Sequence, residues 1–334
     1  MFLRASALAI FAFLGLPAAA QCVGSSYLDG LSASQQNALE TAATALPYRE
    51  GTLWTATRDD KTMTIGGTMH IYDPRLEPLY NEVRDEVAQA DLILLEATPA
   101  EEAELQEMIV TDPDLLFITE GPTLPELLDD ETWALIADAA TQRGIPGFMA
   151  AKMQPWYLSI VLSIPPCATQ DMLSGNLGLD HMITEGAQNA GVPMQALEPV
   201  TTLFELFEGN PMDEQIDMLM VNLSAPETQQ RMFVSRLDSY FAQDVGTLWE
   251  MSRIAMAEVP GVDLAAAEQM FAQLEDALLI QRNRNWMPVI AEAAATHDDL
   301  VVAVGAAHLI GDFGILWFLE QDGWALERIP YVSP

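Results

Sequence analysis

The chain has few basic residues. Its 334 residues include 14 lysines and arginines against 49 aspartates and glutamates, which gives a net charge of −35. Proteins bind nucleic acids and anionic membranes mainly by neutralising phosphates with Lys and Arg. The composition therefore excludes a nucleic-acid partner and argues against an anionic membrane surface. We interpret the excess acid as a means of staying soluble in a salty medium; attraction of cationic substrates or metal ions is the functional alternative.

Long apolar runs are missing too, apart from one at the start. Residues 1–20 read "MFLRASALAIFAFLGLPAAA": Arg4, an apolar run over residues 5–16, a break at Pro17 and three alanines. This pattern is typical of a secretory signal peptide, and the run is too short to span a bilayer comfortably. We therefore expect a periplasmic or secreted protein with no stable membrane insertion after signal cleavage.

Cysteine is almost absent, since the chain has only Cys22 and Cys167. An even count in an exported chain favours one structural disulfide over two free thiols. Because Cys22 follows the predicted cleavage site, lipoprotein anchoring at Cys22 is an alternative. Gln21 is an unusual residue in front of a lipidated cysteine, so we expect a soluble protein.

Strand patterns lie near both ends of the chain. The segment "GTLWTATRDDKTMTIGGTMHI" predicts a hairpin, and "DLILLEATP", "DDLVVAVGAAH" and "WALERIPYV" predict three further strands. "EPLYNEVRDEVAQA" has helical spacing, as has most of the chain from about residue 100 to 295, where "GVPMQALEP" is a strand-like interruption. Strands this apolar must be covered on both faces. We predict a single α/β domain over residues 21–334, with a central mixed sheet built from the N- and C-terminal β-rich segments and a large, mainly helical middle section.

Two of the four histidines follow a strand and a glycine at the same spacing. His70 ends "GGTMH" and His308 ends "GAAH". In open α/β sheets, ligands bind at the carboxyl edge of the strands, and glycine allows close approach there. His181 in "GLDH" also matches this spacing, but no apolar strand precedes it, so we interpret it as a helix-surface or structural histidine. His297 is expected at an exposed helix end.

Glu96 ends the strand "LILL" and is the third candidate. An ionised carboxylate there needs a metal, a basic group or amide donors; alternatively it reaches water or caps the helix that begins near Pro99. Two histidines and one carboxylate at the carboxyl ends of strands would form a metal site with open positions for water and substrate. For each histidine, a hydrogen-bonded core position is the alternative.

Arg282 in "QRNRNWM" stands on a helix whose other residues suit burial, in a chain poor in base. It either points into the site to stabilise an oxyanion or bind a substrate carboxylate, or pairs with some of the surplus acid.

These segments together resemble the TraB/GumN family, which is related to the Tiki membrane-associated proteases and, more distantly, to the erythromycin esterase and ChaN-type haem-binding proteins. The matching segments occur in family order over nearly the whole mature chain: "GTMH", "LLEATP", "KMQPW", "GLDHMI", "AGVPMQALEP", "QRNRNWM" and "VAVGAAHLIGDFGILWFLEQDGWALERI". The resemblance implies a metal-dependent hydrolase fold with a duplicated strand-based core. It places His70 and His308 in a paired Gly-x-x-His signature, with Glu96 as the acidic partner and Arg282 as polar support, and it gives Asp180 and Glu198 supporting positions.

The sequence thus predicts an exported hydrolase, a peptidase by the resemblance, that acts on a peptide or small-molecule substrate. His70, Glu96 and His308 are the predicted ligands of a divalent ion such as Zn, Mn or Co, and these three residues with Arg282 are the predicted catalytic set. Glu96 acting as a general base beside a two-histidine metal is an alternative. A non-enzymatic haem- or metal-binding protein is the second hypothesis, and a structural or assembly role is the third.

Overall fold

The computed structural model describes residues 22–175, 177–207, 210–221, 223, 225–257 and 263–331. The predicted signal peptide, residues 1–20, lies outside the described residues. No helix among those described is long and apolar enough to cross a membrane.

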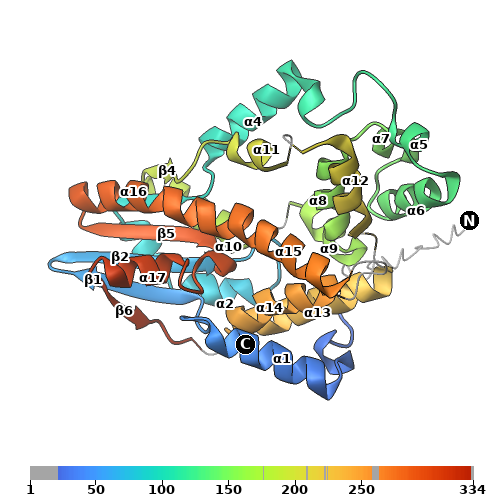
Figure 1. Cartoon of the computed structure of the whole chain (residues 1–334). Helices are drawn as coiled ribbons and strands as arrows, with labels where there is room; N and C mark the ends of the chain where they lie inside the picture. The colour runs from blue at the N-terminus through green and yellow to red at the C-terminus, as the bar shows by residue number, and fades with distance from the viewer. Residues whose placement is uncertain are drawn as a thin grey trace, which may run out of the picture.

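One six-stranded mixed sheet forms the centre of the molecule (Figure 1). Its strands lie in the order β4-β3-β5-β2-β1-β6. They are β1 (Leu53–Arg58), β2 (Lys61–Thr68), β3 (Leu92–Leu95), β4 (Met194–Ala196), β5 (Asp299–Gly305) and β6 (Ala325–Arg328). Strands β4, β3, β5 and β2 pair in parallel, whereas β1 is antiparallel to both β2 and β6. The prediction of a mixed α/β sheet formed from the two ends of the chain is confirmed.

Helices occupy most of the remaining chain. They are α1 (Ala33–Ala45), α2 (Leu76–Asn81), α3 (Arg84–Gln89), α4 (Pro99–Thr111), α5 (Leu124–Leu127), α6 (Asp130–Thr141), α7 (Gly147–Ala150), α8 (Pro155–Ser163), α9 (Pro166–Leu173), α10 (Leu179–Ala190), α11 (Thr202–Phe207), α12 (Met212–Val221), α13 (Pro226–Phe241), α14 (Val245–Ala257), α15 (Leu264–Glu275), α16 (Gln281–Thr296) and α17 (Ile315–Gln321). A π-helical turn, Asp276–Ile280, joins α15 to α16.

The predicted hairpin pairs β1 with β2 through Arg58 and Lys61, so that Asp59 and Asp60 form the turn. The predicted helix between β2 and β3 is broken into α2 and α3. At the break, Val83 leaves the helical region of backbone space, with φ −120° and ψ 6°. Its side chain nevertheless stays buried beside Leu79 and Val87, so the apolar spacing was interpreted correctly and only the continuity of the helix was wrong.

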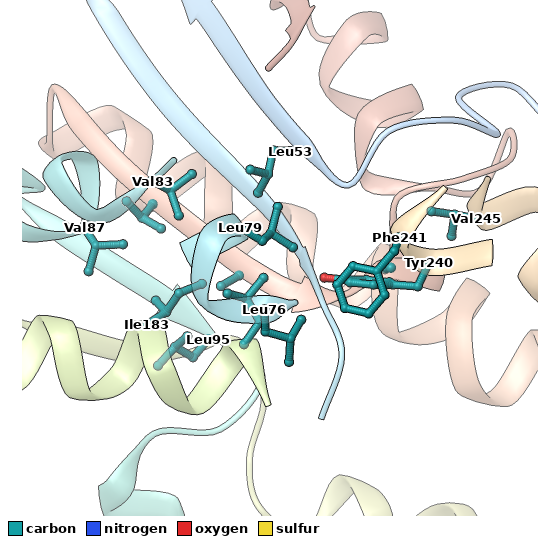
Figure 2. Packing of buried hydrophobic residues seen from close by; sticks show 14 of the residues in the cluster. Leu53, Leu76, Leu79, Val83, Val87, Leu95, Ile183, Tyr240, Phe241 and Val245 are labelled. Carbon is teal, nitrogen blue, oxygen red and sulfur yellow. The ribbon is translucent and has the colours of Figure 1, made fainter. Parts of the chain in front are cut away.

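Apolar side chains cover both faces of the sheet. On one face, residues of β3 and β5 pack against α2, α3, α10 and α13, and Figure 2 shows Leu79, Val83, Val87 and Ile183 gathered there. On the other face, the alternate residues of the same strands pack against α16 and α17, with Trp286 at the centre of that cluster. Burial on both sides explains why β3 and β5 are continuous apolar runs instead of alternating ones.

The helical middle section has a core of its own. Residues of α5, α6, α7, α8 and α12 form a separate apolar cluster that includes Leu124, Ile136 and Leu158. In Figure 1 these helices lie together at the right, away from the strands. This part of the middle section therefore extends from the sheet, whereas α10, α13 and α16 of the same section cover it.

Cys22 and Cys167 form a disulfide across a sequence separation of 145 residues, as the cysteine count predicted. It ties the start of the described chain to α9, which lies shortly before the start of α10. The bond thereby restrains the segment that leads to the carboxyl edge of the sheet.

We expect the paired substitution Cys22→Ser and Cys167→Ser to lower the free energy of unfolding. Closing a loop of this length restricts the unfolded chain, which is worth about 5 kcal/mol in the chain-entropy model, and measured values are often smaller. Urea unfolding of wild type and variant, with and without dithiothreitol, measures the difference. Dithiothreitol should bring wild type to the level of the variant and leave the variant unchanged; a difference below about 1 kcal/mol would contradict the prediction.

Candidate functional site

The carboxyl ends of four parallel strands meet at one edge of the sheet. Thr68 at the end of β2 pairs with Gly305 at the end of β5, and Leu95 at the end of β3 pairs with Ala303 and with Ala196 of β4. Each of the four strands is followed within three residues by a histidine or a glutamate. These side chains are His70, Glu96, Glu198 and His308. The parallel register therefore brings together residues from distant parts of the sequence.

Glycine at position 67 allows the turn after β5 to approach β2. A Cβ atom at Gly67 would lie 2.8 Å from Leu309 Cδ1 and 3.0 Å from Ala306 Cα. The turn Ala306–His308 is a 3₁₀ helix that carries the buried ring of His308. A larger residue at position 67 would push this turn away from the sheet.

Arg282 lies at the centre of the charged side chains. Its Nη2 atom donates to Glu96 Oε2 at 2.6 Å and to Glu198 Oε1 at 2.6 Å, and its Nη1 atom is 3.2 Å from His308 Nε2. The residue is 8% exposed. Arg282 thus lies beside the predicted site residues and pairs there with two glutamates, as the alternative interpretation required. Its role towards a substrate stays a prediction.

Glu198 fixes the guanidinium of Arg282 in place. It accepts from Nε of Arg282 at 3.0 Å as well as from Nη2, and it accepts the indole N–H of Trp286 at 2.9 Å. The same guanidinium lies over the Trp286 ring, 4.7 Å from its centroid. Such a two-point contact between arginine and carboxylate fixes the direction of the guanidinium as well as its distance.

The ring of His308 is held in one tautomer. Asn283 donates its Nδ2 hydrogens to the carbonyl oxygens of His308 and Phe313, at 3.3 and 2.9 Å, which leaves its Oδ1 as an acceptor. His308 Nδ1 lies 2.7 Å from that oxygen and therefore carries the hydrogen. The lone pair on Nε2 then faces Arg282. The ring also packs on Trp286, with centroids 4.4 Å apart.

His70 lies in a different environment. Its side chain is 62% exposed, and its Nδ1 atom is 3.1 Å from Asp180 Oδ2. The hydrogen bond with Asp180 raises the pKa of His70 above the ordinary value, and burial opposes the effect. Because much of the ring is open to solvent, water screens part of this attraction.

The three predicted ligands surround one point. From the position that a Cβ atom on Gly305 would occupy, Glu96 Oε1 is 3.4 Å away, His308 Cδ2 is 3.6 Å and His70 Nε2 is 4.0 Å. Glu96 also accepts the Gly305 amide at 2.6 Å. Glycine at 305 thus leaves open the small volume on which the three side chains converge. The helix-cap alternative for Glu96 is not observed, because Thr98 and Glu101 cap α4.

The charges of Glu96 and His308 are set by their surroundings. Burial alone would raise the pKa of Glu96, but His308, His70, Arg282 and the Gly305 amide together lower it to about 2. Burial lowers the pKa of His308 to about 3, so this ring is neutral at pH 7 and attracts the carboxylate only in acid. Near neutral pH, His70, Arg282 and the amide of Gly305 are therefore the groups that keep Glu96 ionised.

The side chains of His70, Glu96 and His308 have the chemistry of ligands for a divalent ion, but their arrangement is not that of a metal site. Two imidazole nitrogens and a carboxylate suit zinc, manganese or cobalt, and in each histidine the other ring nitrogen is hydrogen-bonded, as in most metal-bound histidines. Among the described residues, however, no three His, Cys, Asp or Glu side chains are placed to hold a metal ion. The guanidinium of Arg282 contacts both Glu96 and His308.

Comparison with known protein families decides the assignment. The model of the TraB/PrgY/gumN family matches residues 52–328, most of the chain. The chain belongs to the TraB/PrgY/gumN family. No curated protein and no solved structure matches it. In this family member the two Gly-x-x-His segments, Glu96 and Arg282 all lie at one edge of the sheet.

Other sequence candidates lie outside the site. His181 is on α10, where it pairs with Glu185 at 3.5 Å, and His297 ends α16. A surface cavity of about 260 Å³, lined by residues that include Asp85 and Glu86, lies at the amino ends of β2 and β5, on the opposite edge of the sheet.

Sequence reasoning missed Asn283 and Trp286. Both stand in the segment "QRNRNWM", from which only the arginines were considered. Residues 282, 283 and 286 share one face of a helix by their spacing, and all three are buried. The helical spacing of residues 283 and 286 from Arg282 is the sequence signal that identifies them.

We expect the ion pair of Glu96 to stabilise the TraB/PrgY/gumN fold above pH 4.5 and to lose that effect in acid. Its folded pKa of about 2 lies below the ordinary 4.5, so the contribution is complete above the unfolded pKa and disappears as pH falls towards the folded one. Urea unfolding of metal-free wild type and Glu96→Gln at pH 6 and pH 3 should show their difference shrinking by about 2 kcal/mol. A difference that does not change with pH would contradict the assignment.

Proposed function

We propose that this protein is an exported, metal-dependent hydrolase of peptide bonds, with His70, Glu96 and His308 holding a divalent ion. The convergence of these three side chains on the position beside Gly305 is the observation that carries the proposal. Family membership supports it only at the level of the fold and the paired histidine segments. The peptidase class rests on the resemblance to the Tiki proteases.

Binding of an ion requires the guanidinium of Arg282 to give up a contact. Its Nη1 atom lies in front of the His308 lone pair, and Nη2 bridges Glu96 and Glu198. Glu198 would keep hold of Nε and Nη2 while the contacts with Glu96 and His308 open. Arg282 would then stay beside the reacting groups as a donor for negative charge that develops on a substrate carbonyl.

A bound divalent ion would activate a water molecule and polarise the scissile carbonyl. The carboxylate of Glu96, with a pKa of about 2, is a weak base near neutral pH, which favours a ligand role over the general-base alternative. The neutral, buried ring of His308 suits a ligand for the same reason, since it does not need to lose a proton first. The side chain of His70 is largely exposed, so substrate would approach from its side of the site.

The disulfide between Cys22 and Cys167 supports export, because such bonds form and persist mainly in oxidising compartments. A periplasmic or secreted location, a cleaved signal peptide and an unlipidated Cys22 are part of this proposal.

The second candidate is a binding protein for haem or a metal ion with no catalytic activity. The exposed side chain of His70 is the feature that would serve it.

We expect His70→Ala and His308→Ala each to weaken zinc binding by more than the roughly 10–100-fold that loss of a hydrogen-bond partner of a ligand costs. Both variants should also lose peptide hydrolysis. Zinc affinity is measured by competition with a chelator, and hydrolysis with a mixed peptide library. His181→Ala, which removes a histidine of the same spacing on α10, is the matched control and should behave as wild type.

The outcomes separate the hypotheses. Unchanged metal affinity and hydrolysis in both histidine variants would refute the proposed site. Metal binding that depends on the histidines, without hydrolysis of any peptide, would favour the binding protein. A shift of the haem Soret band on titration, lost in His70→Ala, would assign haem as its ligand.

A further inference from the structure

The two site histidines differ in what holds their rings. His308 is buried, stacks on Trp286 and donates to Asn283. His70 lies beyond the end of β2, and most of its side chain is open to solvent. An exposed imidazole samples several rotamers. A single orientation of the His70 ring therefore requires a hydrogen-bonding partner that is itself fixed in place.

The backbone around His70 is joined tightly to the start of α10. The amide of Gly178 donates to the His70 carbonyl at 3.1 Å, and the amide of Leu179 donates to the Met69 carbonyl at 3.0 Å. A Cβ atom at Gly178 would lie 1.8 Å from the Met69 oxygen and 2.7 Å from His70 Cα. The glycine is therefore required for this contact, and two backbone hydrogen bonds join the start of α10 to residues 69 and 70.

Asp180 stands in that first turn, where a carboxylate is favoured by the helix dipole. Its Oδ2 atom contacts His70 Nδ1 at 3.1 Å. Its Oδ1 atom is buried, and no described residue donates a hydrogen bond to it. The hydroxyl of Tyr240, on neighbouring α13, donates instead to the Gly67 carbonyl at 2.8 Å. His70 is thus the hydrogen-bonding partner that the structure gives to this carboxylate.

We propose that Asp180 is the positioning residue of His70: it binds Nδ1–H, fixes the tautomer and turns Nε2 towards Glu96 and His308. The inference rests on the proposed function, because it assigns to Asp180 an effect on the metal affinity of His70. A carboxylate hydrogen-bonded to a metal-bound histidine orients the ring and strengthens its donor nitrogen. Asp180 and Asn283 would then have the same role: the charged Asp180 accepts from Nδ1 of His70, and the neutral Asn283 accepts from Nδ1 of His308.

Two substitutions separate the hydrogen bond from the charge. Asp180→Asn keeps an oxygen that can accept from Nδ1–H but removes the charge, whereas Asp180→Ala removes both. We expect zinc affinity to fall about 10-fold in the first variant and about 100-fold in the second. Affinity is measured with a chelator that buffers free zinc, at pH 9, where protons compete least for the imidazole nitrogen. The visible spectrum of the cobalt-loaded protein should change in the same order.

Glu185→Gln is the matched control, because it removes a carboxylate that pairs with a histidine on the same helix, His181, away from the site. It should keep wild-type affinity and spectrum. Thermal unfolding followed by circular dichroism checks that each variant is folded, and the nearly isosteric Asp180→Asn keeps the test valid if Asp180→Ala does not fold.

Three results would overturn the assignment of Asp180: an affinity of Asp180→Ala within threefold of wild type, an Asp180→Asn variant as weak as Asp180→Ala, or an Asp180→Asn variant with the affinity of wild type. Failure of the proposed function looks different. In that case wild type would bind no zinc, or His70→Ala would bind it as tightly as wild type does, and the role of Asp180 would fall with the metal site.

Discussion

The parallel pairing of β2 with β5 is the constraint on which the site depends. It joins two segments from opposite ends of the chain, from Thr62 and Asp299 at one end of the ladder to Thr68 and Gly305 at the other. A shift of this register by one residue would reverse which side chains face each side of the sheet. Glycine at 67 lets the turn after β5 lie against β2. The two Gly-x-x-His segments thus form one structural unit. Each strand contributes a histidine, and the glycines allow the segments to lie close together.

Arg282 joins the remaining elements to this pair of strands. It stands on α16 and is bonded to Glu96 after β3 and to Glu198 after β4. Breaking a buried ion pair by removing one partner costs several kcal/mol, because a buried charge is left without compensation. Removing the arginine would therefore destabilise the edge of the sheet. A cation at the proposed site would compete with Arg282 for Glu96 and His308, and Glu198 could hold the arginine while these contacts open.

Local sequence pattern was sufficient to predict the strands and the edge at which His70, Glu96 and His308 meet. Apolar runs bounded by glycine and a polar residue fix where a buried strand ends, and parallel strands end on the same side. The supporting contacts are not local. Asp180 contacts His70, which lies more than a hundred residues earlier in the chain. The segment "GLDH" does not by itself show that Asp180, and not His181, contacts the site. Asn283 acquires its role only because the helix it stands on packs over the turn of His308.

Charge connects these contacts to the acidity of the chain. The carboxylates of Glu96 and Glu198 share the guanidinium of Arg282, and Asp180 contacts His70, so three carboxylates stand against one arginine and one histidine. The hydrogen bond with Asp180 raises the pKa of His70 and favours a proton on that ring, which still leaves one negative charge without a partner of opposite sign in this group. Since partly buried charges are costly unless they are balanced, this remaining negative charge would be balanced by a cation. An ion that coordinates Nε2 of both histidines would meet this requirement and still leave Arg282 bound to Glu198.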